Sequence, residues 1–155
     1  MIIWSCTPFD ALTPNRLYTC LTLRQAVFVV EQACPYLDAD GADQYSHHII
    51  GEQQGSIVAY ARLVAPGIKY PEPSLGRILT ASSVRSMGIG HQLLKVSLDA
   101  HTRLYPQQAN RIGAQAYLQK FYESVGFQRT SDTIYLEDNI PHMEMLWPAE
   151  QERSL

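Results

Sequence analysis

The hexapeptide Arg85–Gly90 (RSMGIG) has the residue types of an anion-binding loop. It lies between a predicted strand and a predicted helix, and the first N–H groups of a helix are unpaired at the positive end of its dipole. Phosphate groups bind readily there. Gly88 and Gly90 lack a Cβ and allow close approach of an anion, and Arg85 can add a charge-assisted hydrogen bond. The pattern is compatible with phosphate binding, although a lone GxG is more often a plain turn.

Two common nucleotide motifs do not fit this loop. The Rossmann fingerprint requires a third glycine three residues after Gly90, and Leu93 occupies that position. The P-loop string GxxxxGK[ST] does not occur in the chain. A dinucleotide oxidoreductase is therefore disfavoured, and a phosphate-bearing ligand would bind through another fold.

Three acids, Asp38, Asp40 and Asp43, form the only dense acidic segment (DADGAD). When Gly41 is placed at position six of a calcium loop, positions one and twelve carry no acid, so the EF-hand pattern fails. We expect these acids to form a turn; the alternative is a pocket wall for a cationic acceptor. The adjacent histidines His47–His48 point to opposite faces of a strand and do not converge on a metal. We expect no metal site.

Composition indicates one globular domain. The chain has 155 residues, 46% of them hydrophobic and 17% charged, and a net charge of −3. Its twelve Lys and Arg residues form no basic block, so we expect no nucleic-acid surface. Three cysteines without a pairing pattern, no leader-like segment and no apolar run longer than Ala26–Val30 lead us to expect a cytoplasmic protein that does not bind membranes.

Hydrophobic periodicity predicts alternating strands and helices. Thr13-Pro14 should begin a helix that continues to about Val30, and Pro106 should end a second helix that begins after the glycine loop. The other predicted elements are the strands His48–Gly51, Ile57–Val64, Leu75–Ala81, Ile112–Ala116, a strand from Phe127 and His142–Trp147, and the helix Tyr117–Val125. We predict a mixed α/β (α+β) domain over residues 1–147 with helices on the sheet faces, followed by a polar tail, 148–155.

Two motifs together resemble the GNAT family of N-acetyltransferases. RSMGIG matches the [RQ]xxGx[GA] coenzyme A loop of that family, and Ala116–Phe127 (AYLQKFYESVGF) looks like its AxxFYxxxGF element. The ElaA-like branch is similar over further segments: Leu23–Asp43, Tyr60–Leu63, Gly113–Tyr122 and Ile140–His142. The departure is Tyr117, where the branch has His. The resemblance covers nearly the whole chain except the C-terminal tail.

The resemblance implies a GNAT-like fold, a mixed and mostly antiparallel sheet with a central parallel splay between Leu75–Ala81 and Ile112–Ala116. Acetyl-coenzyme A would be the co-substrate, with its pantetheine arm in the splay and its pyrophosphate on the loop amides. The implied contacts are Ile78, Leu79, Thr80, Arg85, Ser86, Met87, Gly88, Ile89, Gly90, Gln119 and Tyr122. A backbone N–H near Leu79 would stabilise the oxyanion.

The implied reaction is acetyl transfer to a primary amine of a small acceptor by direct attack on the thioester. Tyr122 stands where the family places a general acid, and a tyrosine hydroxyl has an ordinary pKa of about 10. The base is left open among Glu31, His142, Glu144 and water. Candidate acceptor-binding residues are Arg24, Phe28, Glu31 and Gln32; Arg24, like Arg62, is equally explained as a structural cation. The alternative function is a catalytically silent acyl-CoA-binding regulatory protein, and a homodimer is left open.

Overall fold

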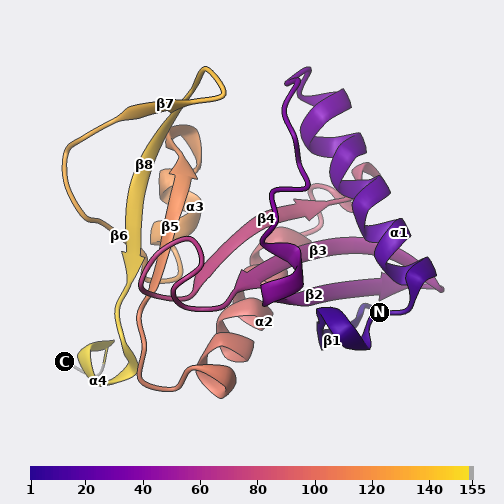
Figure 1. Ribbon diagram of the computed structural model, residues 1–155, viewed down its shortest axis with the longest axis horizontal. Helices are drawn as coiled ribbons and strands as arrows, with labels where there is room; N and C mark the ends of the chain where they lie inside the picture. Colours follow the sequence, from indigo (N-terminus) through magenta and orange to yellow (C-terminus); the bar gives the residue numbers. More distant parts are fainter. Residues whose placement is uncertain (154–155) are drawn as a thin grey trace.

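The computed structural model describes residues 1–153 and contains two four-stranded sheets (Figure 1). The first sheet is antiparallel, in the order β1 (Ile3–Pro8), β2 (Ser46–Gln53), β3 (Ser56–Val64) and β4 (Ser74–Thr80). In the second sheet β8 (Ile140–Trp147) pairs with β5 (Asn110–Gln115), β6 (Gln128–Arg129) and β7 (Tyr135–Glu137). The predicted mixed α/β fold is confirmed.

The two sheets meet where β4 and β5 begin. The Leu75 N–H donates to Asn110 Oδ1 over 3.0 Å, and the Arg111 N–H donates to the Pro73 carbonyl over 3.1 Å. Beyond this junction β4 and β5 belong to different sheets and diverge (Figure 1). The predicted splay between these strands is confirmed, and it opens toward their C-terminal ends.

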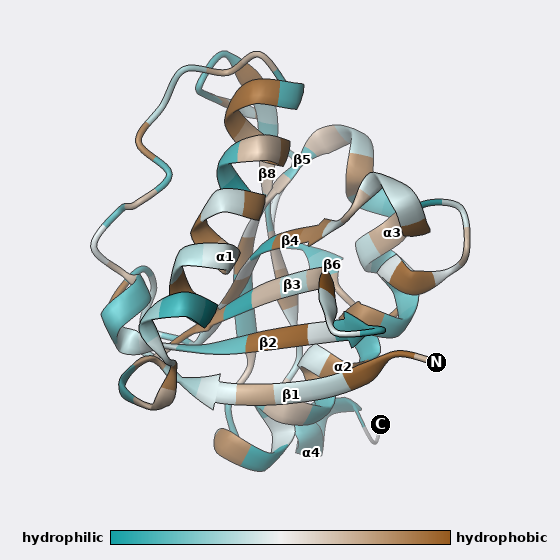
Figure 2. Cartoon of the chain, turned by 90° about the vertical axis from the view of Figure 1, so that its right-hand side faces the viewer, coloured by the Kyte–Doolittle hydropathy of each residue, from teal (hydrophilic) through white to brown (hydrophobic). Residues whose placement is uncertain are grey.

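Helices cover both faces of the first sheet, as predicted. Alternate side chains of a strand point to opposite faces. On β3, Ala59, Ala61 and Leu63 pack in one core with α2 (Ile89–Leu104), whereas Tyr60 packs in a second core with residues of α1 (Pro14–Arg24). Figure 2 shows α1 on the viewer's side of β3. Because α1 and α2 pack on this sheet, their ends and the adjoining loops are held around the open splay.

The first helix changes its geometry where the sequence predicted a regular continuation. α1 ends at Arg24, and Gln25–Glu31 forms a π-helix. Its wide turns are closed by i→i−5 hydrogen bonds from the Gln32 N–H to Val27 and from the Cys34 N–H to Val29. Three valines crowd this segment, and β-branched residues tolerate a regular α-helix less well than unbranched ones. Such π-segments are frequent at functional sites.

The C-terminal third departs from the sequence prediction in three places. The helix predicted over Tyr117–Val125 is a 3₁₀ turn followed by a short α3 (Gln119–Glu123), and Gly126 ends it with φ +109°. β7 was not predicted, because all three of its residues are exposed and carry no apolar alternation. Within the predicted tail, α4 (Glu150–Arg153) forms, and the Arg153 guanidinium lies 3.5 Å from the centroid of the Trp147 ring. Residues 154–155 lie outside the described part.

Candidate active site

A cavity of about 770 Å³ lies in the splay between β4 and β5. Both sheets, the π-helical segment, the loop after it and the glycine loop contribute to its walls. Of the residues predicted to act in the site, the cavity is lined by Phe28, Glu31, Gln32, Ile78, Leu79, Thr80, Arg85, Gly90, Tyr122 and His142. The volume lies in the range of small-molecule and cofactor sites.

The glycine loop begins α2 in the way expected of an anion site. Ser86 and Gly88 have φ of +70° and +76°, and Gly88 is the N-cap residue of α2. A Cβ built on Gly90 would lie 3.7 Å from Phe121 Cε1, so the loop packs directly on the FY element. The two motifs that were separate in sequence therefore meet at one end of the cavity. Ser86, Met87, Gly88 and Ile89 lie beyond the cavity lining, as does Gln119.

Arg85 forms an ion pair that the sequence did not predict. Its guanidinium donates two parallel hydrogen bonds to the Glu31 carboxylate, one of them 2.8 Å from Nη2 to Oε2, and Nε donates to the Thr80 carbonyl over 3.2 Å. These hydrogen bonds from Arg85 lower the pKa of Glu31. A carboxylate held in this way is a weaker base, so the pairing argues against Glu31 as the proton acceptor.

A β-bulge interrupts β4 on the cavity wall. Tyr60 pairs with Leu79 and Arg62 pairs with Gly76, so that Arg77 and Ile78 together face one residue of β3. Arg77 has φ +49° at this point. A bulge leaves one residue outside the regular hydrogen-bond ladder of the strands. Its backbone polar groups, next to Leu79, are therefore available to a ligand.

Tyr122 is enclosed but its hydroxyl is free. The side chain is 8% exposed and packs edge-on against Phe121 and Phe127, with ring centroids 5.2 and 5.6 Å away. Its hydroxyl makes no hydrogen bond to any residue in 1–153. Burial raises the pKa of Tyr122 well above its ordinary value, which keeps the phenol protonated at neutral pH. The geometry suits a proton donor whose hydroxyl can form a hydrogen bond with a ligand.

His142 has a defined tautomer. Its Nδ1 lies 2.7 Å from the Ile140 carbonyl oxygen, which can only accept, so Nδ1 carries the proton and Nε2 of the neutral ring is an acceptor. Nε2 lies 3.4 Å from Glu137 Oε2, and the ring stacks on Tyr135 with centroids 5.8 Å apart. Glu144, in contrast, does not line the cavity and receives a hydrogen bond from Arg111.

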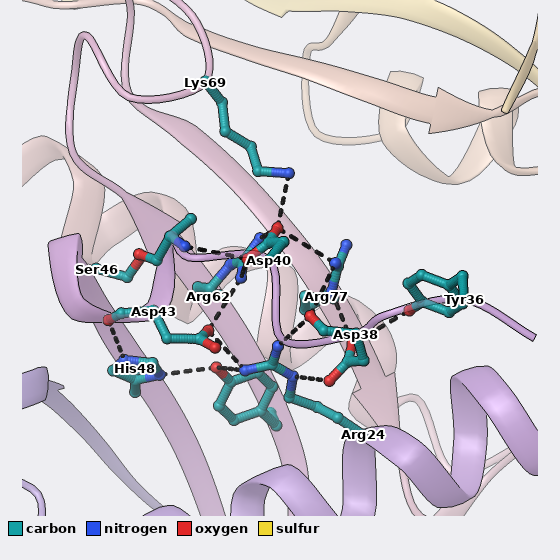
Figure 3. Close-up of polar contacts among 12 residues, drawn as sticks. Arg24, Tyr36, Asp38, Asp40, Asp43, Ser46, His48, Arg62, Lys69 and Arg77 are labelled. Atoms are coloured by element: carbon teal, nitrogen blue, oxygen red, sulfur yellow. Dashed lines mark hydrogen bonds and ion pairs between the residues drawn. The ribbon is translucent and has the colours of Figure 1, made fainter. Parts of the chain in front are cut away.

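The acidic segment forms a buried ion network and not an open acidic surface (Figure 3). Asp38 and Asp43 pair with Arg24 at 2.8 and 2.7 Å, and Asp40 pairs with Arg62 at 2.8 Å. Burial opposes the ionisation of Asp40, yet hydrogen bonds from Arg62 and Lys69 hold its pKa well below the usual range. The network fixes the loop that lines part of the cavity.

The position of Arg24 corrects one expectation. Its side chain is fully buried and does not line the cavity, so it holds the loop and does not contact an acceptor. Sequence reasoning missed Lys69, Arg77 and Glu137, which all line the cavity. No motif marks these three residues, and Lys69 lies in the Pro/Gly-rich segment Pro66–Pro73.

Neither a cluster of metal-binding side chains nor a membrane-spanning helix occurs in residues 1–153. No cluster of three or more His, Cys, Asp and Glu side chains suited to hold a metal occurs in this part of the chain. No helix within it is long and apolar enough to cross a membrane.

Comparison with known proteins agrees with the geometry. Residues 22–148 match the acetyltransferase (GNAT) domain family. Protein ElaA of Escherichia coli (strain K12) is 40% identical over 147 residues, which cover 94% of this chain and 95% of ElaA. A UPF0039 protein of Synechocystis is 42% identical over 147 residues, with 94% and 95% covered.

Solved structures agree as well. An acyl-CoA N-acyltransferase from Pseudomonas aeruginosa superposes with a TM-score of 0.89 at 39% identity, and E. coli ElaA with 0.88 at 38%; each comparison covers 94% of this chain and 99% of the other. Acyl-CoA is the co-substrate typical of this fold. The chain therefore belongs to the GNAT acetyltransferase family, in its ElaA-like branch.

Proposed function

We propose that this protein is an N-acetyltransferase that moves an acetyl group from acetyl-coenzyme A to a primary amine of a small acceptor. One observation carries the proposal: the glycine loop packs on the FY element at the cavity, where the Tyr122 hydroxyl is free. A phosphate-binding loop next to an unpaired phenol is what thioester chemistry on a coenzyme A ester requires.

The donor binds along the glycine loop and β4. Backbone N–H groups of Ser86–Gly90 at the start of α2 receive the pyrophosphate, and the edge of β4 at Ile78–Thr80 receives the pantetheine amides. A backbone N–H at the bulge, near Leu79, polarises the thioester carbonyl and stabilises the oxyanion.

The acceptor reacts from the His142 side of the cavity. Nε2 of His142 removes the proton from the ammonium, and Glu137 stabilises the imidazolium that results. The neutral nitrogen attacks the thioester carbonyl carbon, the C–N bond forms, and the C–S bond breaks. Tyr122 gives its proton to the departing sulfur, which leaves as free thiol. The nitrogen loses its second proton after the C–N bond has formed, this proton restores the Tyr122 phenol, and solvent takes the proton from His142.

An acetylation assay tests this proposal. Purified protein is incubated with acetyl-coenzyme A and a panel of amines, and the free thiol released is followed with time. We expect thiol release that depends on both an amine and the protein. Saturable coenzyme A binding without thiol release over a broad panel would contradict the enzyme and support an acyl-CoA-binding regulatory protein.

A further inference from the structure

Two cations of the cavity wall, Lys69 and Arg77, share one carboxylate oxygen. Lys69 Nζ lies 2.9 Å and Arg77 Nη2 lies 3.3 Å from Asp40 Oδ2, and Figure 3 shows both side chains directed toward Asp40. Asp40 also receives two hydrogen bonds from Arg62. One carboxylate is thus the common partner of three cations.

The ion network that includes this wall carries an excess of positive charge. It contains four cations, Arg24, Arg62, Lys69 and Arg77, but three carboxylates, Asp38, Asp40 and Asp43. Of these residues Asp40, Arg62, Lys69 and Arg77 line the cavity. The neighbouring His48 adds no negative charge, and burial lowers its pKa so that it is neutral at pH 7.

The excess lies at the cavity surface. The side chains of Arg24 and Arg62 are 0% and 2% exposed, whereas those of Lys69 and Arg77 are 38% and 20% exposed. Within residues 1–153 the Lys69 ammonium has one partner for its three N–H donors, and Nη1 of Arg77 has none. Both residues can therefore bind a further anion.

The opposite wall has the reverse character. His142, Glu137 and Asp138 line it, and Glu137 is 3.4 Å from the His142 ring. These groups attract an ammonium and, through Nε2 of His142, accept its proton. One wall of the cavity is thus cationic, and the other carries two carboxylates and the basic Nε2 of His142. This arrangement suits a ligand that carries both a negative and a positive charge.

The two walls are close to each other. Tyr70, the residue after Lys69, places its hydroxyl 3.2 Å from the position of a Cβ on Gly113 of β5. Two residues further along β5, Gln115 pairs with His142. The segment that carries Lys69 therefore lies against β5, the strand that pairs with β8 and its His142.

We propose that the acceptor is a small amino carboxylate, with its carboxylate bound by Lys69 and Arg77 and its amine directed at His142. This inference rests on the proposed acetyltransferase function and names its substrate class. It replaces the alternative drawn from the acidic segment, a pocket wall for a cationic acceptor, because each acid there is already paired with a cation.

The test uses acceptor pairs that differ only in the carboxylate, such as phenylalanine with phenethylamine and lysine with cadaverine, with thiol release as the readout. We expect kcat/KM to be at least tenfold higher for the member that carries the carboxylate. Lys69→Met should lower this kcat/KM about 10- to 100-fold, the size of a charge-assisted hydrogen bond, and should leave the KM for acetyl-coenzyme A unchanged. Lys95→Met, at an exposed position on α2, is the matched control.

Equal or better turnover of the amine without a carboxylate, or an equal effect of Lys69→Met on both members, would overturn the inference and leave the proposed function intact. If no amine releases thiol, the proposed function fails, and calorimetric titration of the protein with the same pairs in the presence of coenzyme A decides the inference. Carboxylate-dependent binding that Lys69→Met weakens would support it. Equal binding of both members, or binding of neither, would overturn it.

Discussion

Arg85 and Glu31 lie 54 residues apart in the sequence, both line the cavity, and they form a bidentate ion pair there. Arg85 begins the glycine loop, and Glu31 ends the π-helical segment. The pair therefore connects the glycine loop with the π-helical segment. It also gives Glu31 a role other than the base that the sequence left open.

The first prediction separates these two roles of Glu31. We expect Glu31→Gln to keep kcat within about threefold, because the proposed mechanism gives the proton to His142 and not to Glu31. A general base contributes about 10²- to 10⁴-fold, so its loss would be unmistakable. Steady-state kinetics with acetyl-coenzyme A and a productive amine make the measurement, and Glu123→Gln, an exposed acid on α3, is the control. A hundredfold fall in kcat would assign the base to Glu31.

The second prediction concerns the proton donor. Tyr122→Phe removes only the hydroxyl, which makes no hydrogen bond within residues 1–153, so folding should be unaffected. We expect kcat to fall about 10²-fold or more, with little change in the KM for acetyl-coenzyme A. Tyr45→Phe at a well-exposed position serves as the matched control. Unchanged turnover in Tyr122→Phe would refute the assignment.

The third prediction concerns His142. His142→Gln removes the imidazole that accepts the proton, and we expect kcat/KM to fall about 10²- to 10⁴-fold. The measurement is steady-state kinetics of both proteins with acetyl-coenzyme A and a productive amine. An unchanged kcat/KM in the variant would show that another group or water takes the proton.

The fourth prediction concerns stability and pH. Burial lowers the pKa of His48 below its ordinary 6.5, so below that pH the unfolded chain binds a proton that the folded protein excludes. The free energy of unfolding should therefore fall as the pH drops below about 6.5, by at most about 1.4 kcal/mol per pH unit from this group. A second loss should follow below about pH 4, because Asp40 and Asp43 have lowered pKa values in the folded state.

Urea titrations at pH 8, 6.5 and 5 test the first of these losses. His48→Gln should be less stable than the wild type at pH 8 but should vary less with pH between 6.5 and 5. An equal pH dependence in both proteins would contradict the role of His48.

The residues of each segment predicted the helices and strands that hold the site. Contacts between distant segments could not be predicted from them. Pro106 and Gly126 end helices for reasons that lie in their own backbone, and both ends were predicted close to where they occur. The splay, in contrast, depends on contacts between chain segments far apart, such as Leu75 with Asn110, and periodicity could not predict it. The resemblance to a family supplied it.

The acceptor side was the least predictable part. Lys69 and Arg77 come from a loop and a bulged strand, and only the folded chain brings both to Asp40. The π-helix was also missed, because its apolar residues are compatible with a regular helix until the wider hydrogen bonds are seen. The acids of Asp38–Asp43 were predicted to form a turn or a pocket wall, and the sequence did not show that their cationic partners lie on other elements.

The most direct measurement follows an isotope-labelled acetyl group from acetyl-coenzyme A into products by mass spectrometry, with wild type and Tyr122→Phe in parallel. The proposed function predicts a labelled N-acetyl amide, formed in equal amount to the free thiol by the wild type and at a rate at least about 10²-fold lower by the variant. Saturable binding of acetyl-coenzyme A with no labelled amide from any acceptor would contradict it.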